Sequence, residues 1–172
     1  MFFRDPERSP DGGDGAIISP ADGKVVFAGP ADKGDPLAPE SGMRVSIFMS
    51  PLNVHVNRMP AAGTVADIRY NKGKFEAAYS EKAAEVNESS AMLVKTRSGM
   101  DLVVIQIAGW LARRIVCKVA PGTSLQRGER FGLIMFGSRV DVYLPDTVSI
   151  TTKVGDRVAA GRSVIAEERS GS

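Results

Sequence analysis

The chain has 172 residues, of which 43% are hydrophobic and 24% are charged, a composition typical of one compact domain with its own core. The formal net charge is only +2 and the cations form no continuous run, which argues against nucleic acid as a partner. No apolar segment approaches the roughly 20 residues that a membrane-spanning helix requires.

Short segments rich in Val and Ile, each ended by Gly, Pro, Asp or Ser, follow one another along the chain. This pattern predicts β-strands, and therefore a mainly β, single-domain fold with few short helices. The predicted strands are 23–29, 44–49, 63–70, 91–98, 101–109, 113–120, 130–136, 139–145 and 148–154. Two segments have helical features: Ser50-Pro51, which could cap and start one turn of helix, and 74–88, which fits a loop equally well.

Two internal similarities suggest repeated units. The segment PADGKV at 20–25 is similar to PAAGTV at 60–65, and the segment beginning at Gly122 is similar to the one beginning at Gly155. Members of the second pair share a Gly-x-x-hydrophobic-x-x-Gly pattern, which looks like the half-barrel hairpins of biotinyl and lipoyl domains. Repeated hairpins that cannot bury an apolar face alone are expected to pack on one another. We therefore expect interlocked β-hairpins that resemble a barrel-sandwich hybrid.

Few residues can carry chemistry. The chain has no phosphate-binding loop, no dinucleotide fingerprint and no Cys or His pair at metal spacing. His55 is the only imidazole, and by itself a histidine between two valines is more often a packed core residue. Asp22 by itself is most simply a turn residue before glycine. Gly137-Ser138 stands between two predicted strands without the Asn-Gly or Asp-Gly residues of a tight hairpin, so Ser138 is either a bulge residue or a functional one.

Five segments change these interpretations when they are considered together: FFRDPER, ISPADGKV, SIFMSPLNVHVNRMPAAGTV, IQIAGWLARRIVCKV and RGERFGLIMFGSRVDVYLP. In this order they resemble the short bacterial form of phosphatidylserine decarboxylase, over almost the whole chain. Members of that family are proenzymes that cleave themselves between the Gly and the Ser of the last segment. The resemblance implies cleavage at Gly137-Ser138 into a larger chain, 1–137, and a smaller one, 138–172.

The resemblance also implies roles for four residues. Ser138 becomes a pyruvoyl group, the cofactor, with no metal and no pyridoxal phosphate. Gly137 tolerates unusual backbone angles and leaves the approach to its carbonyl unobstructed. The Ser138 hydroxyl needs a base and the base needs an orienting group, and the family pattern points to His55 and Asp22 for these two roles. The implied reaction is decarboxylation of phosphatidylserine to phosphatidylethanolamine in phospholipid biosynthesis.

Substrate contacts and location are further expectations. Arg58, Arg139 and Arg113 are candidates for pairing with the lipid phosphate or carboxylate, although each could be an ordinary surface charge. Longer family members have a second histidine where this chain has Arg58, so one imidazole must serve both processing and turnover. Short-form relatives usually carry apolar segments ahead of FFRDPER. We expect a peripheral enzyme on the cytoplasmic side of the cell membrane. A homo-oligomer is also consistent with the sequence.

A function of a different class is also consistent with part of the pattern. The segment SEKAAEV around Lys82 resembles the modified-lysine hairpin of lipoyl domains, which would make the protein a carrier module. This alternative leaves FGSRVDVYLP unexplained.

Overall fold

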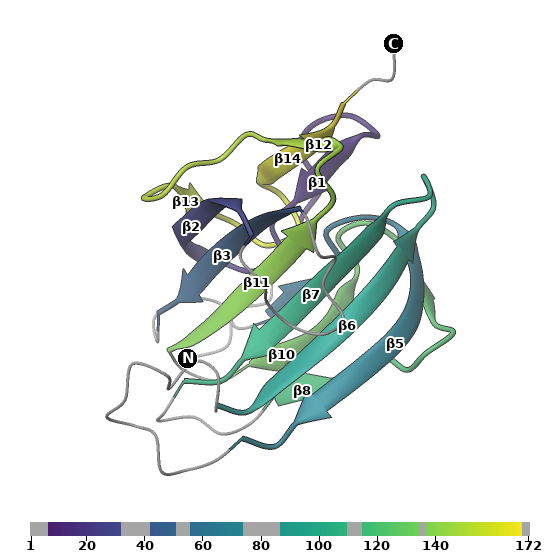
Figure 1. Cartoon of the computed structure of the whole chain (residues 1–172), viewed down its shortest axis with the longest axis vertical. Helices are drawn as coiled ribbons and strands as arrows, with labels where there is room; N and C mark the ends of the chain where they lie inside the picture. Colours follow the sequence, from purple (N-terminus) through teal and green to yellow (C-terminus); the bar gives the residue numbers. More distant parts are fainter. Residues whose placement is uncertain are drawn as a thin grey trace.

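The computed structural model describes residues 7–31, 42–50, 56–73, 87–109, 115–134 and 137–169. All fourteen regular elements in these ranges are β-strands (Figure 1), as the sequence predicts for a mainly β domain. No helix in the described part of the chain is long and apolar enough to cross a membrane. Pro51 and most of the segment 74–88 lie outside the described residues, so both helical predictions stay predictions.

Eight strands form one large sheet, and every neighbouring pair in it is antiparallel. In spatial order they are β13 (Arg157–Val158), β2 (Gly23–Pro30), β3 (Met43–Met49), β11 (Ser138–Leu144), β7 (Asp101–Ile107), β6 (Ser89–Thr96), β5 (Gly63–Asn71) and β9 (Ser124–Leu125).

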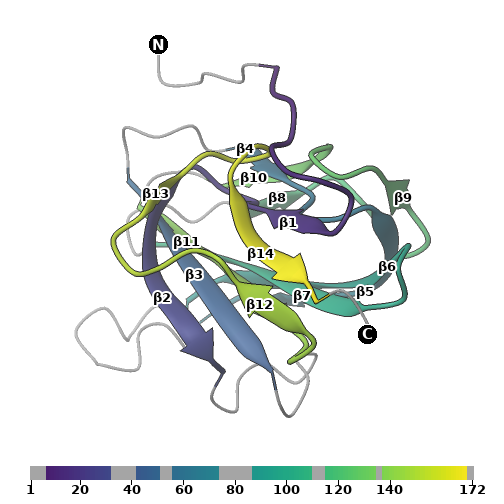
Figure 2. The ribbon, with the colours of Figure 1, turned by 90° about the horizontal axis from the view of Figure 1, so that it is seen from above.

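Two smaller antiparallel sheets accompany the large one. One contains β1 (Ala16–Ile18), β14 (Val164–Glu168) and β12 (Val148–Ile150), and the other contains β4 (Val56–Arg58), β10 (Arg130–Ile134) and β8 (Ile115–Cys117). Seen from above, the large sheet curves around both of them (Figure 2). The sheets do not close into a barrel, so the expected hairpins are present in a more open arrangement.

The main core lies between the sheets, and a second, smaller apolar cluster on the opposite face of the large sheet contains Val103, Ile105 and Tyr143. The inner face of the large sheet contributes Val25, Ile47 and Val140, which are fully buried because apolar residues alternate along each of these strands. The small sheets contribute side chains such as Phe131 of β10 and Ile165 of β14. This shared core holds segments that are far apart in the sequence.

The internal similarities correspond to two copies of one structural unit. Gly23 at the start of β2 pairs with β13, and Gly63 at the start of β5 pairs with β9. A Cβ added to Gly23 would lie 2.1 Å from the carbonyl oxygen of Phe48, and one added to Gly63 would lie 2.5 Å from that of Lys95. Glycine is therefore required at both positions because another strand passes too close for any side chain.

Candidate active site

The Gly137–Ser138 bond lies where the chain passes from one sheet to another. β10 ends at Ile134 in a three-stranded sheet, β11 begins at Ser138 in the middle of the large sheet, and the two strands do not pair with each other. The bond is thus not part of a hairpin, which explains the missing hairpin residues. Gly137 has a φ of +62°, and a Cβ added to it would meet no atom within 4 Å. Backbone conformation, rather than lack of space, favours glycine here.

Ser138 is 1% exposed and lies opposite Met49, the last residue of β3. Because side chains alternate along a strand, it projects to the same face as Val140 and Val142, which are fully buried. The serine hydroxyl is therefore held in the core at the head of a strand, away from bulk water.

Two buried amide side chains lie beside the row of Ser138 and Met49. Gln106 is 1% exposed and donates from Nε2 to Oδ1 of Asn57, which is fully buried, over 2.9 Å. Asn57 in turn donates from Nδ2 to the carbonyl oxygen of Pro20 over 3.3 Å, with the Met49 sulfur 3.7 Å away. Asn57 thus connects β4, β7, the end of β3 and the turn after β1.

Asp22 lies in the turn between β1 and β2, and its side chain is only 14% exposed. Both of its carboxylate oxygens accept hydrogen bonds from the Arg8 guanidinium, and the Nη2–Oδ2 distance is 2.9 Å. The backbone N–H of Ala160 also donates to Oδ1 over 2.6 Å. Asp22 is therefore held in a defined orientation by a cation and a backbone donor, and its role beside His55 stays a prediction.

The turn that carries Asp22 is attached to the strand that follows His55. The carbonyl oxygen of Pro20 accepts hydrogen bonds from the Arg58 N–H over 3.0 Å and from the Asn57 side chain. His55 immediately precedes this strand, β4, but lies outside the described residues, so its role as the base stays a prediction. The structure brings together the turn that carries Asp22, the expected partner of His55, and β4, the strand that follows His55.

Arg58 is buried, with 4% of its surface exposed, and its role in substrate binding stays a prediction. Its Nη1 donates to the carbonyl oxygen of Gly128 over 3.1 Å, and a Cβ added to Gly161 would lie 2.5 Å from its Cδ. These are the second glycines of the two repeated Gly-x-x-hydrophobic-x-x-Gly units. The arginine that replaces the second histidine of longer relatives therefore holds the two units together.

Arg139 projects to the opposite face of the large sheet from Ser138. Its Nη2 donates to Oδ2 of Asp141 over 3.2 Å and its Nε lies 3.0 Å from Oδ1, although this second contact lacks hydrogen-bond geometry. The Asp141 side chain is 3% exposed, so this ion pair is mostly buried. Arg113 lies outside the described residues, and its substrate contact stays a prediction.

Asn87 and Glu88, which directly precede β6, lie near the end of β7 that contains Ile107. Asn87 donates from Nδ2 to the carbonyl oxygen of Ala108 over 3.0 Å, and Glu88 accepts from the N–H of Ile115 over 3.0 Å. The hydroxyl of Tyr70 also donates to Glu88, which raises the tyrosine pKa because the hydrogen bond favours the protonated phenol. Asn87 and Glu88 therefore anchor the backbone at Ala108 and at Ile115.

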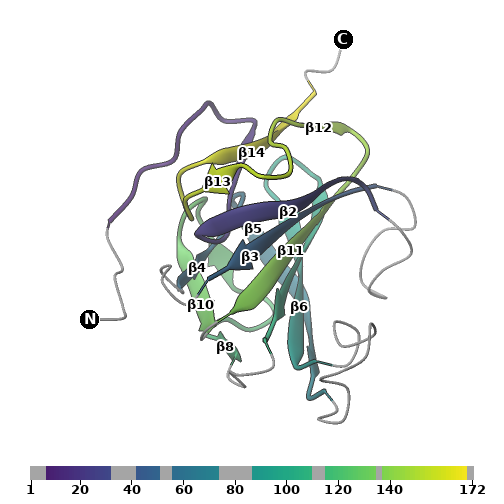
Figure 3. The same ribbon diagram turned by 90° about the vertical axis from the view of Figure 1, so that its left-hand side faces the viewer.

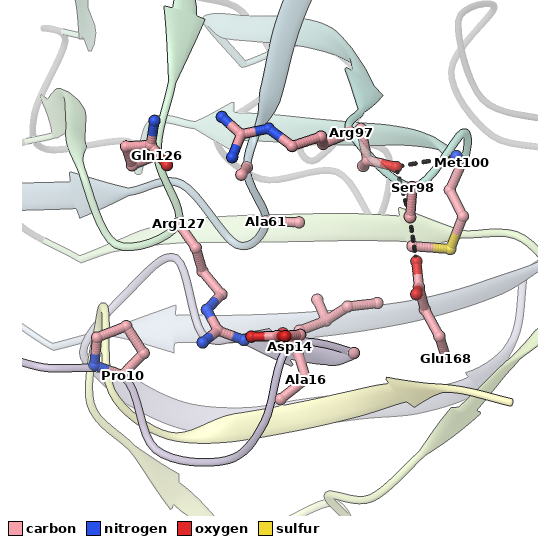
Figure 4. A pocket seen from close by; sticks show the side chains of 14 residues that line it. Pro10, Asp14, Ala16, Ala61, Arg97, Ser98, Met100, Gln126, Arg127 and Glu168 are labelled. Carbon is pink, nitrogen blue, oxygen red and sulfur yellow. Dashed lines mark hydrogen bonds between the residues drawn. The ribbon is translucent and has the colours of Figure 1, made fainter. Parts of the chain in front are cut away.

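A cavity of about 610 Å³ lies elsewhere in the molecule, beside the turn between β6 and β7 (Figure 4). In it, Ser98 donates to Glu168, and Arg127 donates to the carbonyl oxygens of Gly13 and Ala16 over 2.6 and 2.9 Å. Among the residues that line it, none is a predicted site residue. It lies at the opposite end of β7 from the row that contains Ser138, so it is not the reaction centre.

Sequence reasoning missed Arg8, Asn57 and Gln106. Arg8 is the last residue of the FFRDPER segment, and Asn57 occurs within NVHVNRMP, so both lie in segments that carry the resemblance. Gln106 interrupts the apolar run of a buried strand, and this is the only signal that marks it.

Comparison with known proteins shows which family this chain resembles in sequence. The family model described as phosphatidylserine decarboxylase matches residues 1–166. A relative from Syntrophotalea carbinolica is 53% identical over 164 residues, and one from Nitratidesulfovibrio vulgaris is 50% identical over 167 residues. These matches cover 95% and 97% of this chain and 76% of each relative. Both relatives are named phosphatidylserine decarboxylase proenzyme.

The matched region includes Gly137, Ser138 and Asp22. The chain belongs to the phosphatidylserine decarboxylase family.

Proposed function

We propose that this chain is a self-processing decarboxylase that converts phosphatidylserine into phosphatidylethanolamine in phospholipid biosynthesis. One observation carries the proposal: the Gly137–Ser138 bond joins two sheets, with Ser138 buried at the head of an interior strand. The family supplies the reaction class, and relatives named proenzymes make a processing step expected.

Processing begins with attack of the Ser138 Oγ on the carbonyl carbon of Gly137. The C–O bond forms, the amide C–N bond breaks and the nitrogen gains a proton, which leaves an ester. Loss of the Ser138 α-proton then breaks the Cβ–Oγ bond, releasing the carboxylate of residue 137 and leaving dehydroalanine. Water adds to the imine tautomer and ammonia departs, so residue 138 ends as a pyruvoyl group. We assign His55 as the base, oriented by Asp22; such assistance contributes roughly 10²–10⁴ in rate.

The residues around Ser138 fit this group. Its burial and the neighbouring Asn57–Gln106 pair provide a dry, ordered site in the core. When present, the ketone of the pyruvoyl group supplies an electron sink for the electrons left by departing CO₂, so no metal or pyridoxal phosphate is required. His55 is the proposed proton donor to the product. Arg58, Arg113 and Arg139 are the candidates for pairing with the lipid phosphate or carboxylate.

The two chains made by cleavage stay together. β11 is hydrogen-bonded to β3 on one side and to β7 on the other, so the smaller chain, 138–172, begins with an interior strand. Two of its other strands also pair with the larger chain, since β13 pairs with β2 and β14 pairs with β1, while β12 pairs with β14. Cleavage therefore changes the chemistry at residue 138 without separating the halves of the core.

We place the enzyme peripherally on the cytoplasmic side of the membrane, because its substrate is a membrane lipid.

The intact mass of the purified protein under denaturing conditions tests this proposal. We expect one species for residues 1–137 and a second for residues 138–172 with a pyruvoyl group at its start. Ser138→Ala should give a single chain of 18.3 kDa, whereas Ser124→Ala, at the start of β9, should process normally. An unsplit wild-type chain that is folded but inactive on phosphatidylserine would overturn the proposal.

A further inference from the structure

A row of side chains crosses one end of the outer face of the large sheet. Arg157 of β13 lies opposite Lys24 of β2, Lys24 lies opposite Phe48 of β3, and Phe48 lies opposite Arg139 of β11. Directly opposed residues of antiparallel strands project to the same face, and this face is the one opposite the core. We name these four residues the basic–aromatic row. In Figure 3 the start of β2, the end of β3 and the start of β11 lie side by side.

Exposed apolar side chains surround this row. Val26 follows Lys24 by two residues on β2. Val154 lies in the loop before β13, which is tied to β2 by a hydrogen bond from the Gly155 N–H to the Val25 carbonyl over 2.9 Å. Three of the four exposed large hydrophobic side chains in the described ranges therefore gather at this corner: Val26 at 45%, Phe48 at 43% and Val154 at 62%, the fourth being Tyr70 at 57%.

The positive charge of the row is only partly balanced. Asp141 pairs with Arg139, and Asp156 accepts hydrogen bonds from the Lys153 N–H and the Thr152 hydroxyl in the loop that carries Val154. Lys24 and Arg157 are exposed and make no ion pair with any residue that the structure describes. The corner therefore combines exposed cations with apolar side chains that face solvent.

We propose that this corner is the surface that lies on an anionic phospholipid bilayer. Apolar and aromatic side chains enter the boundary of the hydrocarbon region, while lysine and arginine reach lipid phosphates. The inference rests on the proposed function, because only an enzyme with a lipid substrate needs such a surface beside its reaction centre. Ser138 and Met49 occupy the next row, about 3.4 Å along the strands from Phe48 and Arg139. Docking would thus bring the substrate headgroup to the end of the sheet where the pyruvoyl group forms.

Sedimentation with vesicles tests this surface independently of turnover. Mature enzyme is mixed with phosphatidylcholine vesicles that contain phosphatidylglycerol, an anionic lipid without the serine headgroup. Lys24→Gln should weaken vesicle binding about fivefold, because this is the loss expected when one cation no longer interacts with the anionic membrane surface. Phe48→Ser should weaken binding as well. The matched control is Arg97→Gln, an exposed arginine in the turn between β6 and β7, which should bind as wild type.

Raising the ionic strength separates the electrostatic contribution of Lys24 to vesicle binding from the apolar contribution of Phe48. The Lys24→Gln effect should disappear at high ionic strength, while the Phe48→Ser effect should persist, since screening acts only on charge. Both variants should process normally and keep their activity on a soluble short-chain phosphatidylserine. Unchanged vesicle binding in both variants, or equal loss in Arg97→Gln, would overturn the surface assignment. Oligomers that the variants abolish without loss of vesicle binding would assign the row to a second copy instead. An unsplit chain without activity on the soluble lipid would overturn the proposed function alone.

Discussion

Replacing Asn57 by leucine is the sharpest test of the buried amide pair. The change keeps the side-chain volume similar but removes the acceptor that Gln106 uses at 2.9 Å. The Pro20 carbonyl keeps its hydrogen bond from the Arg58 N–H, so the Gln106 amide is the group that loses its partner. Gln106 is 1% exposed, and a buried donor without a partner costs about 1–3 kcal/mol. We expect the free energy of unfolding to fall by about 2 kcal/mol or slightly more.

The assay is urea unfolding followed by circular dichroism, in a Ser138→Ala background so that one uncleaved chain unfolds. Gln106→Leu alone should also destabilise the fold, because it leaves Oδ1 of Asn57 without its donor. The double variant should be more stable than the sum of the single effects predicts, by about 1–2 kcal/mol, since neither partner is then left alone. Additivity within about 0.5 kcal/mol would refute the reasoning. The exposed Asn71→Leu serves as the control.

Three other perturbations follow from individual contacts. Arg8→Met should slow self-cleavage, measured by gel densitometry, because Asp22 loses the cation that orients it; unchanged cleavage would separate Asp22 from processing. The pKa of Asp156 lies below its ordinary value of 3.8, chiefly through the Lys153 N–H and then the Thr152 hydroxyl. Its stabilising contribution is therefore present above pH 3.8 and lost as the pH falls through the lowered value, so the Tm difference from Asp156→Asn should vanish in acid; a constant difference would contradict this. Gly23→Ala should cost roughly 1–3 kcal/mol in chemical unfolding, because its Cβ would meet a carbonyl at 2.1 Å, whereas Gly13→Ala, with open space, should be neutral.

Several features could be predicted because they depend on neighbouring residues only. Alternation of Val and Ile with polar residues predicted strands such as 23–29 and 139–145, which the structure confirms as β2 and β11. Short strands without such a run were not predicted; they are β1, β4, β9 and β13, and the five-residue strand β14 was missed as well. The similarity of 20–25 to 60–65 reflects two equivalent units, because the same close strand contact demands glycine in both.

The candidate active site likewise contains residues that the sequence predicted and contacts that it did not. The sequence by itself determined the family, the Gly137–Ser138 bond and the candidacy of Asp22, because those residues stand in contiguous segments whose chemistry can be recognised locally. Only the tertiary structure decided that Arg8 holds Asp22, that Asn57 meets Gln106, and that Arg58 lies between the repeated units. These contacts join residues that are 14 to 70 positions apart. Such distances are closed by the packing of sheets around a shared core, and no local pattern records them.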